Sequence, residues 1–283
     1  MRNKRSYWLF LLPSLLGVAF FYIVPFIYSF CYAVIDNMTS WEFVGLRHFE
    51  ETLCNPLFLQ AAGNTVLFVC ICVPLSMGLA LLLALCLKGL KRCRPLATLV
   101  LLVPLVVPSG SIVSFWNTLF SSNGLVMKML LQAGFSHEAV SPSDWSMAAL
   151  VVIFLWKNVS YNIVLFWSGL NWIPKTYYEQ MALEGAGVFR QFANVTWVYL
   201  APTTFVVLLM SIVNSFKVFK EVYMLYGSYP SPEIYMLQHY MNNQFAAMNM
   251  QKLSAAAYIM FLVIGLALLA VFYAQKRVTD SFQ

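Results

Sequence analysis

Residues 169–202 read GLNWIPKTYYEQMALEGAGVFRQFANVTWVYLAP and connect two long apolar segments. Pro174 precedes a run of helix-favouring residues, which is the pattern of a helix start. Gly185 and Gly187 then interrupt the run, and a second amphipathic segment follows from Val188. The connection is far longer than a turn between two helices requires. The sequence therefore predicts a helix, a glycine elbow and a second helix, a rigid projection suited to contact another protein.

The overall composition requires a membrane environment. Of the 283 residues, 61% are hydrophobic and only 10% are charged, so a water-soluble globule of this length would lack polar surface. The formal net charge of +6 is scattered in small groups between apolar runs. A nucleic-acid-binding protein concentrates positive charge on one face, so this distribution argues against nucleic acid as a partner. The lipid bilayer is the expected solvent.

Six apolar segments are long enough to cross a bilayer, because about 20 helical residues span its hydrocarbon core. They cover residues 7–34, 61–87, 96–120, 145–170, 199–226 and 253–274. The sequence thus predicts an all-α, polytopic membrane protein. We expect one transmembrane domain over residues 1–283, with a loop over residues 171–198 between the fourth and fifth spans.

The positions of Lys and Arg predict the orientation, because positively charged loops stay in the cytoplasm. With the amino terminus inside, the outer segments hold only Arg47, Lys128 and Lys252. The cytoplasmic segments then hold Arg2, Lys4, Arg5, Lys88, Lys91, Arg92, Arg94, Lys175, Arg190, Lys276 and Arg277. Both termini and the 171–198 loop are therefore expected on the cytoplasmic side.

The 171–198 loop resembles the EAA loop of binding-protein-dependent ABC transporter permeases. That pattern is roughly EAA, two residues, Asp-Gly-Ala, then a Phe six residues after the Ala and a Pro beyond. The matching positions are Glu179, Gly185, Ala186, Phe192 and Pro202. The departures are Gln180 and Met181 for two alanines, Glu184 for the aspartate, and Val198 where a proline is common.

Further stretches look like parts of carbohydrate-type permeases of the maltose, lactose and glycerol-phosphate kind. They are residues 43–69, IPKTYYEQMALEGAG at 173–187 and SFKVFKEVYML at 215–225. The resemblance can be followed from Arg5 to Arg277. It implies the permease fold of a type I ABC importer, with six transmembrane helices and a cytoplasmic EAA coupling helix, in a bacterial inner membrane.

The resemblance also implies partners. In such importers two permease subunits form the pore, two cytoplasmic ATPases each grip one EAA loop, and an extracellular solute-binding protein delivers a sugar or oligosaccharide. We expect a heterodimer with a second, different permease, because carbohydrate importers commonly pair two. The residues implied in ATPase coupling are Glu179, Ala182, Glu184, Gly185, Ala186, Gly187 and Phe192.

ATP is expected to act through those partners. The phosphate-binding pattern G-x-x-x-x-G-K-[ST] does not occur in the sequence. We therefore expect that this chain is not an enzyme and holds no cofactor, and that the ATPases bind ATP and Mg²⁺.

Polar residues within the spans are candidates for a substrate pathway, because such residues are costly in lipid and tend to face a cavity or another helix. Amides and hydroxyls can exchange hydrogen bonds with a sugar, and an aromatic ring can stack on it. The candidates are Ser111, Ser114, Trp116, Asn158, Tyr161, Asn162, Ser211, Asn214 and Lys217. A hydrogen bond between helices or a water-filled vestibule is the alternative for each of them.

The charged residues of the spans leave two alternatives open. Lys157 could bind an anionic substrate or extend its ammonium group to the membrane surface. We expect Lys217, Lys220 and Glu221 near the outer end of the fifth span, where a charge pair meets water.

Two other function classes are less consistent with the sequence. A secondary transporter driven by an ion gradient usually needs carboxylates within its spans, and here no Asp or Glu falls at the centre of one. A membrane-embedded enzyme is disfavoured because HExxH, GxSxG and clustered His are absent. The six cysteines form no CxxC pair, so no metal site is predicted.

Overall fold

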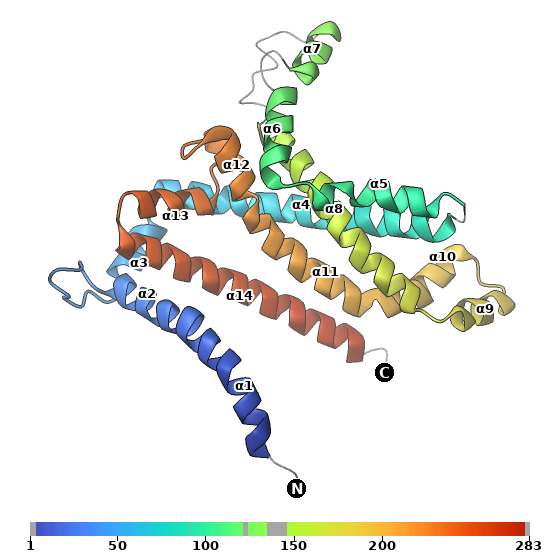
Figure 1. The fold of residues 1–283 in the computed structure, drawn as a ribbon, viewed down its shortest axis with the longest axis horizontal. Coiled ribbons are helices and arrows are strands. Elements are labelled where there is room, and N and C mark those ends of the chain that lie inside the picture. The colour runs from blue at the N-terminus through green and yellow to red at the C-terminus, as the bar shows by residue number, and fades with distance from the viewer. Residues whose placement is uncertain (1–3, 91, 121–123, 135–145, 281–283) are drawn as a thin grey trace. The chain divides into compact units, whose positions relative to one another are not determined.

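The computed structural model describes residues 4–90, 92–120, 124–134 and 146–280, and these residues form helices joined by short connections (Figure 1). The α-helices are α1 (Lys4–Val18), α2 (Val24–Val34), α3 (Arg47–Leu53), α4 (Pro56–Gly89), α5 (Arg94–Val106), α6 (Ser109–Phe120), α7 (Leu125–Gln132), α8 (Ser146–Trp172), α9 (Lys175–Leu183), α10 (Val188–Gln191), α11 (Trp197–Lys217), α12 (Phe219–Tyr226), α13 (Leu237–Ala246) and α14 (Met250–Asp280). Two π-helical segments, Ala19–Ile23 and Phe192–Thr196, and a 3-10 turn, Pro232–Ile234, complete the list for these residues.

The described chain separates into two compact units. One comprises Met1–Leu59 and Tyr240–Leu266, and the other comprises Gln60–His239 and Ala267–Gln283. The single domain expected from the sequence stays a prediction. Two basic residues of the predicted cytoplasmic segments, Arg2 and Lys91, lie outside the described residues, as does the first residue of the predicted fourth span.

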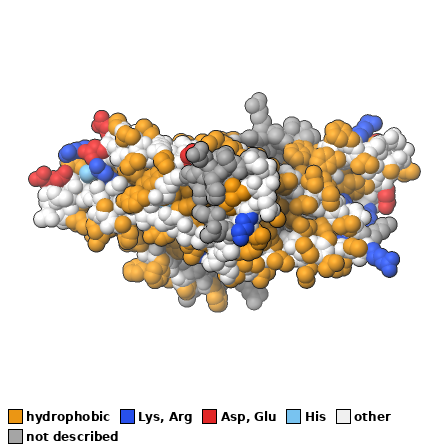
Figure 2. All heavy atoms as spheres, turned by 90° about the horizontal axis from the view of Figure 1, so that it is seen from above, with side chains coloured by type: hydrophobic (Ala, Val, Ile, Leu, Met, Phe, Trp, Pro, Cys, Tyr) orange, Lys and Arg blue, Asp and Glu red, His pale blue; other side chains and the backbone are white. Residues whose placement is uncertain are grey.

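Within the described part of the chain, five helical segments are long and apolar enough to cross a membrane. They are Phe10–Val34, Pro56–Gly89, Met147–Trp172, Val188–Tyr226 and Met250–Tyr273. Hydrophobic side chains cover much of the face drawn in Figure 2, as expected for a surface that meets lipid. The all-α membrane fold predicted from composition is confirmed by these helices.

The third predicted span is not one continuous helix. Residues 96–120 fall on α5 and α6, which meet at an angle of 96°, so the two together count at most as one broken span. The physical reason is Pro108, because a proline disfavours helical backbone at the residue before it. Val107 is accordingly extended, with φ −71° and ψ 126°.

The larger unit is built on α4, α8 and α11, whose small and branched side chains interlock. A fully buried cluster joins Ala80 and Ala84 of α4 to Phe166 of α8 and Leu200 of α11. Gly169 lets α8 approach α11 closely, since a Cβ atom added there would lie 2.6 Å from Thr203 Oγ1. These three helices therefore hold the positions of the residues between them.

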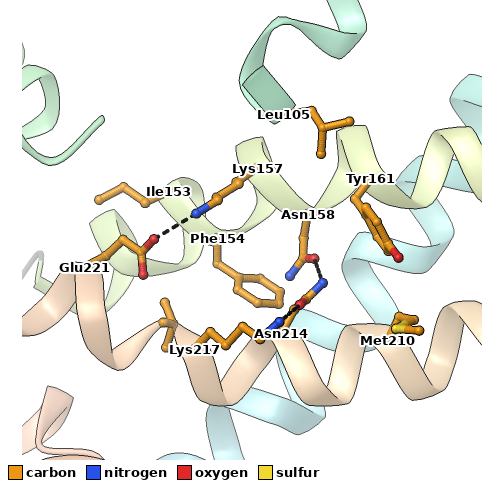
Figure 3. A pocket seen from close by; sticks show the side chains of 11 residues that line it. Leu105, Ile153, Phe154, Lys157, Asn158, Tyr161, Met210, Asn214, Lys217 and Glu221 are labelled. Atoms are coloured by element: carbon orange, nitrogen blue, oxygen red, sulfur yellow. Dashed lines mark hydrogen bonds and ion pairs between the residues drawn. The ribbon is translucent and has the colours of Figure 1, made fainter. Parts of the chain in front are cut away.

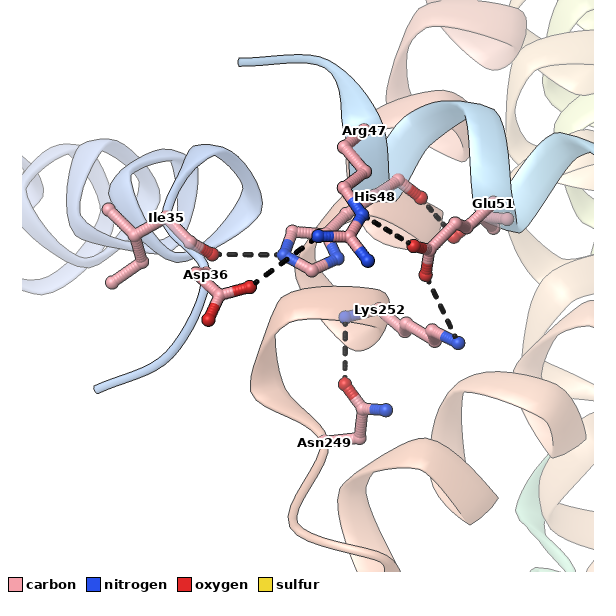
Figure 4. Close-up of polar contacts among 8 residues, drawn as sticks. Ile35, Asp36, Arg47, His48, Glu51, Asn249 and Lys252 are labelled. Carbon is pink, nitrogen blue, oxygen red and sulfur yellow. Dashed lines mark hydrogen bonds and ion pairs between the residues drawn. The ribbon is translucent and has the colours of Figure 1, made fainter. Parts of the chain in front are cut away.

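The smaller unit pairs α2 with the first half of α14. Phe26 and Tyr258 have ring centroids 4.7 Å apart, and Ser29 Oγ donates to Ser254 Oγ at 3.1 Å. At one end, Glu51 binds Arg47 at 3.0 Å and Lys252 at 3.3 Å (Figure 4). Loss of water around Glu51 raises the pKa of its carboxyl group, but the hydrogen bonds and charges of Lys252 and Arg47 together outweigh this effect and hold the pKa below its ordinary value.

Candidate functional site

A cavity of about 330 Å³ lies between α8 and the α11–α12 segment, with one residue of α5 at its edge (Figure 3). Its lining residues are Leu105, Ile153, Phe154, Lys157, Asn158, Tyr161, Met210, Asn214, Lys217, Val218 and Glu221. The volume is at the lower end of the range of small-molecule sites in proteins. The lining combines apolar walls with a few polar groups, as such sites commonly do.

Two asparagines connect the facing helices across the cavity. Asn214 Nδ2 donates to Asn158 Oδ1 at 3.1 Å, and Lys217 Nζ donates to Asn214 Oδ1 at 3.2 Å (Figure 3). Both asparagines therefore have a fixed amide orientation. Each amide also keeps hydrogen-bonding capacity for a solute, since an amide offers two donors and a carbonyl oxygen with two lone pairs.

An ion pair forms the other polar feature of the cavity. Lys157 Nζ lies 3.1 Å from Glu221 Oε1 and donates to Ser109 Oγ at 2.8 Å. The side chain of Glu221 is only 7% exposed. A charge in such surroundings is stable only when it is paired and hydrogen-bonded. Lys157 thus ties α8 to α12 and to the first residue of α6.

This pairing corrects one expectation about the fifth span. The charge pair predicted among Lys217, Lys220 and Glu221 at a water boundary is not the one that forms, because Glu221 is buried and its partner is Lys157. The Lys157 side chain does not simply extend to the surface. Its ammonium group is held inside the cavity lining.

The structure brings some of the predicted pathway residues together and separates others. Those that line the cavity are Asn158, Tyr161, Asn214 and Lys217. Asn162 and Ser211 are fully buried and bind each other, with Nδ2 of the asparagine 2.9 Å from the serine Oγ. That hydrogen bond joins α8 to α11, as in the alternative considered from the sequence.

The three candidates on α6 lie apart from the cavity lining. Ser111 and Ser114 are exposed, and Trp116 packs edge-on against Trp156 with ring centroids 6.3 Å apart. Contact of these residues with a substrate stays a prediction.

Sequence reasoning missed Glu221 as a member of the site. A signal was present, because Glu221 follows Lys217 by one helical turn and so shares its face of the fifth span. Lys157, alone on the fourth span, also required a partner of opposite charge. Leu105 and Met210 carried no such signal, since apolar residues are common in every span.

The second candidate site is the 171–198 loop, which has the predicted helix, elbow and helix. Pro174 caps α9 with extended backbone, and α9 ends at Leu183. Ala186 N then donates to Met181 O at 2.9 Å and Gly185 N donates to Ala182 O at 3.0 Å. This pair of bonds is the Schellman motif, which needs a left-handed residue after the helix. Gly185 supplies that conformation with φ +76°.

The second half of the loop leads directly into the fifth span. Gly187 precedes α10 with extended backbone, and Gln191 Nε2 donates back to Ala186 O at 2.9 Å. The π-helical segment Phe192–Thr196 continues without a break into α11. α10 and the fifth span are therefore connected by continuous helical backbone.

Tyr178 fixes the loop to the rest of the unit. Its hydroxyl group lies 2.9 Å from Thr196 Oγ1 and accepts from Lys88 Nζ at 3.3 Å. The same ammonium group lies 4.3 Å from the centroid of the tyrosine ring, within the range of a cation–π contact. α9 is thereby joined to the end of α4 and to the segment before α11.

The 171–198 loop exposes three large apolar side chains. Leu183, Val188 and Phe189 are 89%, 85% and 84% exposed. Exposed apolar groups of this size next to polar residues are typical of a protein–protein interface. Of the predicted coupling residues, Glu179, Ala182, Glu184, Gly185 and Gly187 are also exposed, Phe192 is half-buried and Ala186 is buried.

Comparison with known proteins places both sites in one family. A family described as "Binding-protein-dependent transport system inner membrane component" matches residues 76–281, which include the cavity and the 171–198 loop. The chain belongs to this family. It is accordingly a membrane component of a transport system, and the resemblance found in the sequence is confirmed.

Individual relatives extend the match over nearly the whole chain. The family member YurN of Bacillus subtilis, a probable ABC transporter permease protein, is 30% identical over 275 residues, which are 94% of each protein. The sn-glycerol-3-phosphate transport system permease protein UgpA of Pectobacterium atrosepticum is 28% identical over 97% of this chain and 96% of its own. UgpA of Rhizobium meliloti is 31% identical over 83% of this chain and 82% of its own.

Solved structures share the fold of this family member. A chain of a bacterial ABC transporter involved in the import of the acidic polysaccharide alginate superposes with a TM-score of 0.82 and 20% identity. The match covers 98% of this chain and 97% of that one. The same transporter type in complex with an alginate pentasaccharide-bound periplasmic protein gives a TM-score of 0.81, over 98% of this chain and 96% of that one. The predicted ABC importer permease fold is confirmed by these two structures.

Proposed function

We propose that this protein is a permease subunit of an ATP-driven ABC importer that takes up a sugar, an oligosaccharide or a related polyol. The carrying observation is that one compact unit contains both a cavity with a few polar groups between the fourth and fifth spans and an exposed two-helix loop continuous with the fifth span. The cavity offers amides and aromatic rings to a polyhydroxyl solute. The loop offers an apolar surface to an ATPase subunit.

The substrate class is supported by the relatives. UgpA proteins belong to sn-glycerol-3-phosphate transport systems, and the two structural neighbours come from an alginate importer. These substrates share hydroxyl-rich carbon chains. The four cavity residues Asn158, Tyr161, Asn214 and Lys217 are suited to such groups, because they combine amides, a hydroxyl and a cation.

The expected partners are those that the resemblance to ABC importer permeases implies. We expect a second permease, different from this one, to complete the pore, and two ATPases to bind ATP and Mg²⁺ and to grip the 171–198 loops. An extracellular solute-binding protein would deliver the solute, as the periplasmic protein bound to the alginate transporter illustrates for that system. Both termini and the loop then face the cytoplasm, in agreement with the distribution of Lys and Arg.

Reconstitution tests the proposal. The chain is purified together with a second permease, an ATPase and a solute-binding protein of the same organism, inserted into liposomes, and assayed for solute uptake with and without ATP. Uptake should require ATP and the ATPase. The variant Glu184→Arg should reduce both uptake and substrate-stimulated ATP hydrolysis, because it reverses a charge on the exposed elbow. Arg190→Gln, a charge change on the neighbouring helix, is the comparison variant.

Two results would contradict the proposal. One is uptake by this chain without any ATPase, driven by an ion gradient and abolished by an ionophore. The other is labelling of a cysteine at position 179 by a membrane-impermeant reagent added outside intact cells.

A further inference from the structure

Three charged side chains line the cavity, and their charges are unequally compensated. Lys157 is paired with Glu221 at 3.1 Å. Lys217 Nζ donates to the neutral Asn214 Oδ1 at 3.2 Å, and among the described residues no carboxylate forms an ion pair with it. One positive charge in the cavity is therefore left without a counter-charge from the described part of the chain.

Lys217 is exposed, so a solute can reach its ammonium group. An ammonium group has three donors, and only one of those on Lys217 is used by Asn214. Leu105, Phe154 and Met210 contribute apolar walls to the same cavity. Because Lys217 is exposed, water and salt screen its charge in part, and the expected preference for an anion is accordingly modest.

Lys157 is held by a structural task and is the weaker candidate for an anion contact. Glu221 is buried, and withdrawing its partner would leave an unpaired carboxylate, which is strongly unfavourable. Lys157 also donates to Ser109 Oγ at 2.8 Å. Two of the three donors of Lys157 are therefore used and Glu221 compensates its charge, whereas Lys217 keeps two donors and has no ion-pair partner among the described residues.

We propose that the solute carries a negatively charged group, a carboxylate or a phosphate, and that Lys217 binds this group while Asn158 and Asn214 bind hydroxyl groups. The inference rests on the proposed function, because it concerns the same cavity. It goes beyond that function by selecting acidic over neutral sugars and polyols, and by assigning the selection to one residue. Charge-assisted hydrogen bonds of this kind are about twice as strong as neutral ones.

The test compares matched solutes that differ by one charge. The complete transporter, without its solute-binding protein, is placed in phosphatidylcholine nanodiscs, and binding of glucuronate and glucose is measured by saturation-transfer NMR. Glycerol 3-phosphate and glycerol form a second pair. Glucuronate should bind more tightly than glucose by on the order of tenfold. The preference should shrink at high salt, because screening weakens the charge interaction.

Three variants locate the preference. Lys217→Gln should remove it, Lys217→Arg should keep it, and Lys220→Gln should leave it unchanged, because Lys220 lies outside the cavity lining. Should Lys217→Gln fail to fold, the arginine variant and the salt titration of the wild type still decide the question. Nanodiscs with phosphatidylglycerol show whether a lipid headgroup competes for the same lysine.

The possible failures are distinguishable. Equal binding of glucuronate and glucose by the wild type, or a preference that survives Lys217→Gln, would overturn the inference. If ATP-driven uptake persists in that case, the proposed function stands and only the charge selection is wrong. If the wild type shows no ATP-dependent uptake of any solute with its binding protein present, the proposed function itself fails.

Discussion

Tyr178 Oη and Thr196 Oγ1 lie 2.9 Å apart, although one belongs to α9 and the other to the π-helical segment before α11. Thr196 is buried, with 4% of its surface exposed. The hydrogen bond therefore connects the two ends of the 171–198 loop and holds its two helices in a fixed arrangement.

Tyr178→Phe should loosen this arrangement while keeping the aromatic ring at position 178. The variant loses the bond to Thr196 and the bond from Lys88, and the free energy of unfolding should fall by about 1 kcal/mol. More ATP should be hydrolysed per solute imported, because the loop no longer moves as one piece. The measurement is the ratio of the two rates in liposomes. Tyr229→Phe, at a residue that is 78% exposed, is the matched control. An unchanged ratio for Tyr178→Phe would show that the loop does not depend on this bond.

Gly185→Ala should damage the elbow through the backbone alone. Gly185 has φ +76°, which costs a residue with a side chain about 1–2 kcal/mol. Gly187 is an internal control, because its φ is −70° and an added Cβ meets no atom within 4 Å at either glycine. The thermal unfolding midpoint should fall for Gly185→Ala and stay near wild type for Gly187→Ala, and ATP-dependent uptake should fall more for Gly185→Ala than for Gly187→Ala. Equal effects of the two substitutions would contradict the role of the left-handed turn.

The Lys157–Glu221 pair should be more costly to break than to replace. Lys157→Met leaves Glu221 buried and unpaired, and should reduce stability by about 2 kcal/mol, less than for a fully buried pair because the lysine is 39% exposed. The double variant Lys157→Met with Glu221→Met should recover most of the loss. Thermal unfolding of the wild type, Lys157→Met, Glu221→Met and the double variant forms a double-mutant cycle. A single variant as stable as the wild type would mean that the pair contributes nothing.

His239 should make the stability of the protein depend on pH. Burial lowers the pKa of His239 to about 4 from its ordinary value of 6.5, and Nδ1 accepts from Met236 N at 3.1 Å. Between those two values the unfolded chain binds a proton and the folded chain does not. Stability contributed by the neutral ring is thus fully present above pH 6.5 and is lost as the pH falls toward 4.

Unfolding midpoints measured from pH 7.5 to 4.5 test this prediction. Over this range the free energy of unfolding of the wild type should decrease by about 3 kcal/mol. His239→Phe should show a smaller decrease, because the phenyl ring does not titrate. A decrease of the same size in His239→Phe would assign the pH dependence to other groups.

The loop and most spans could be predicted because their signals are local. Pro174 marks a helix start and Gly185 a helix end in any context, and long apolar runs identify spans by length. The bend in the third span was missed, although Pro108 is a signal for it. A continuous run of apolar residues does not reveal a change in the direction of the helix axis. The bend belongs to the backbone of Val107, which hydropathy does not describe.

The cavity could be predicted only in part, because its members depend on which helix faces meet. Asn158 and Asn162 are one turn apart on α8, yet Asn158 lines the cavity and Asn162 is bound to Ser211 in the interior. The sequence offers both as polar residues of one span. Only the packing of α11 against α8 separates a residue available to a solute from one used between helices.

The Schellman turn at Gly185 also bears on how the ATPase of the proposed importer would engage and release this subunit. Because the turn is closed by bonds within the chain, the loop has its shape before a partner arrives. Association then pays little for ordering the segment, and dissociation recovers little. A preorganised docking element of this kind favours repeated, reversible attachment, as a machine that cycles with every hydrolysis event requires.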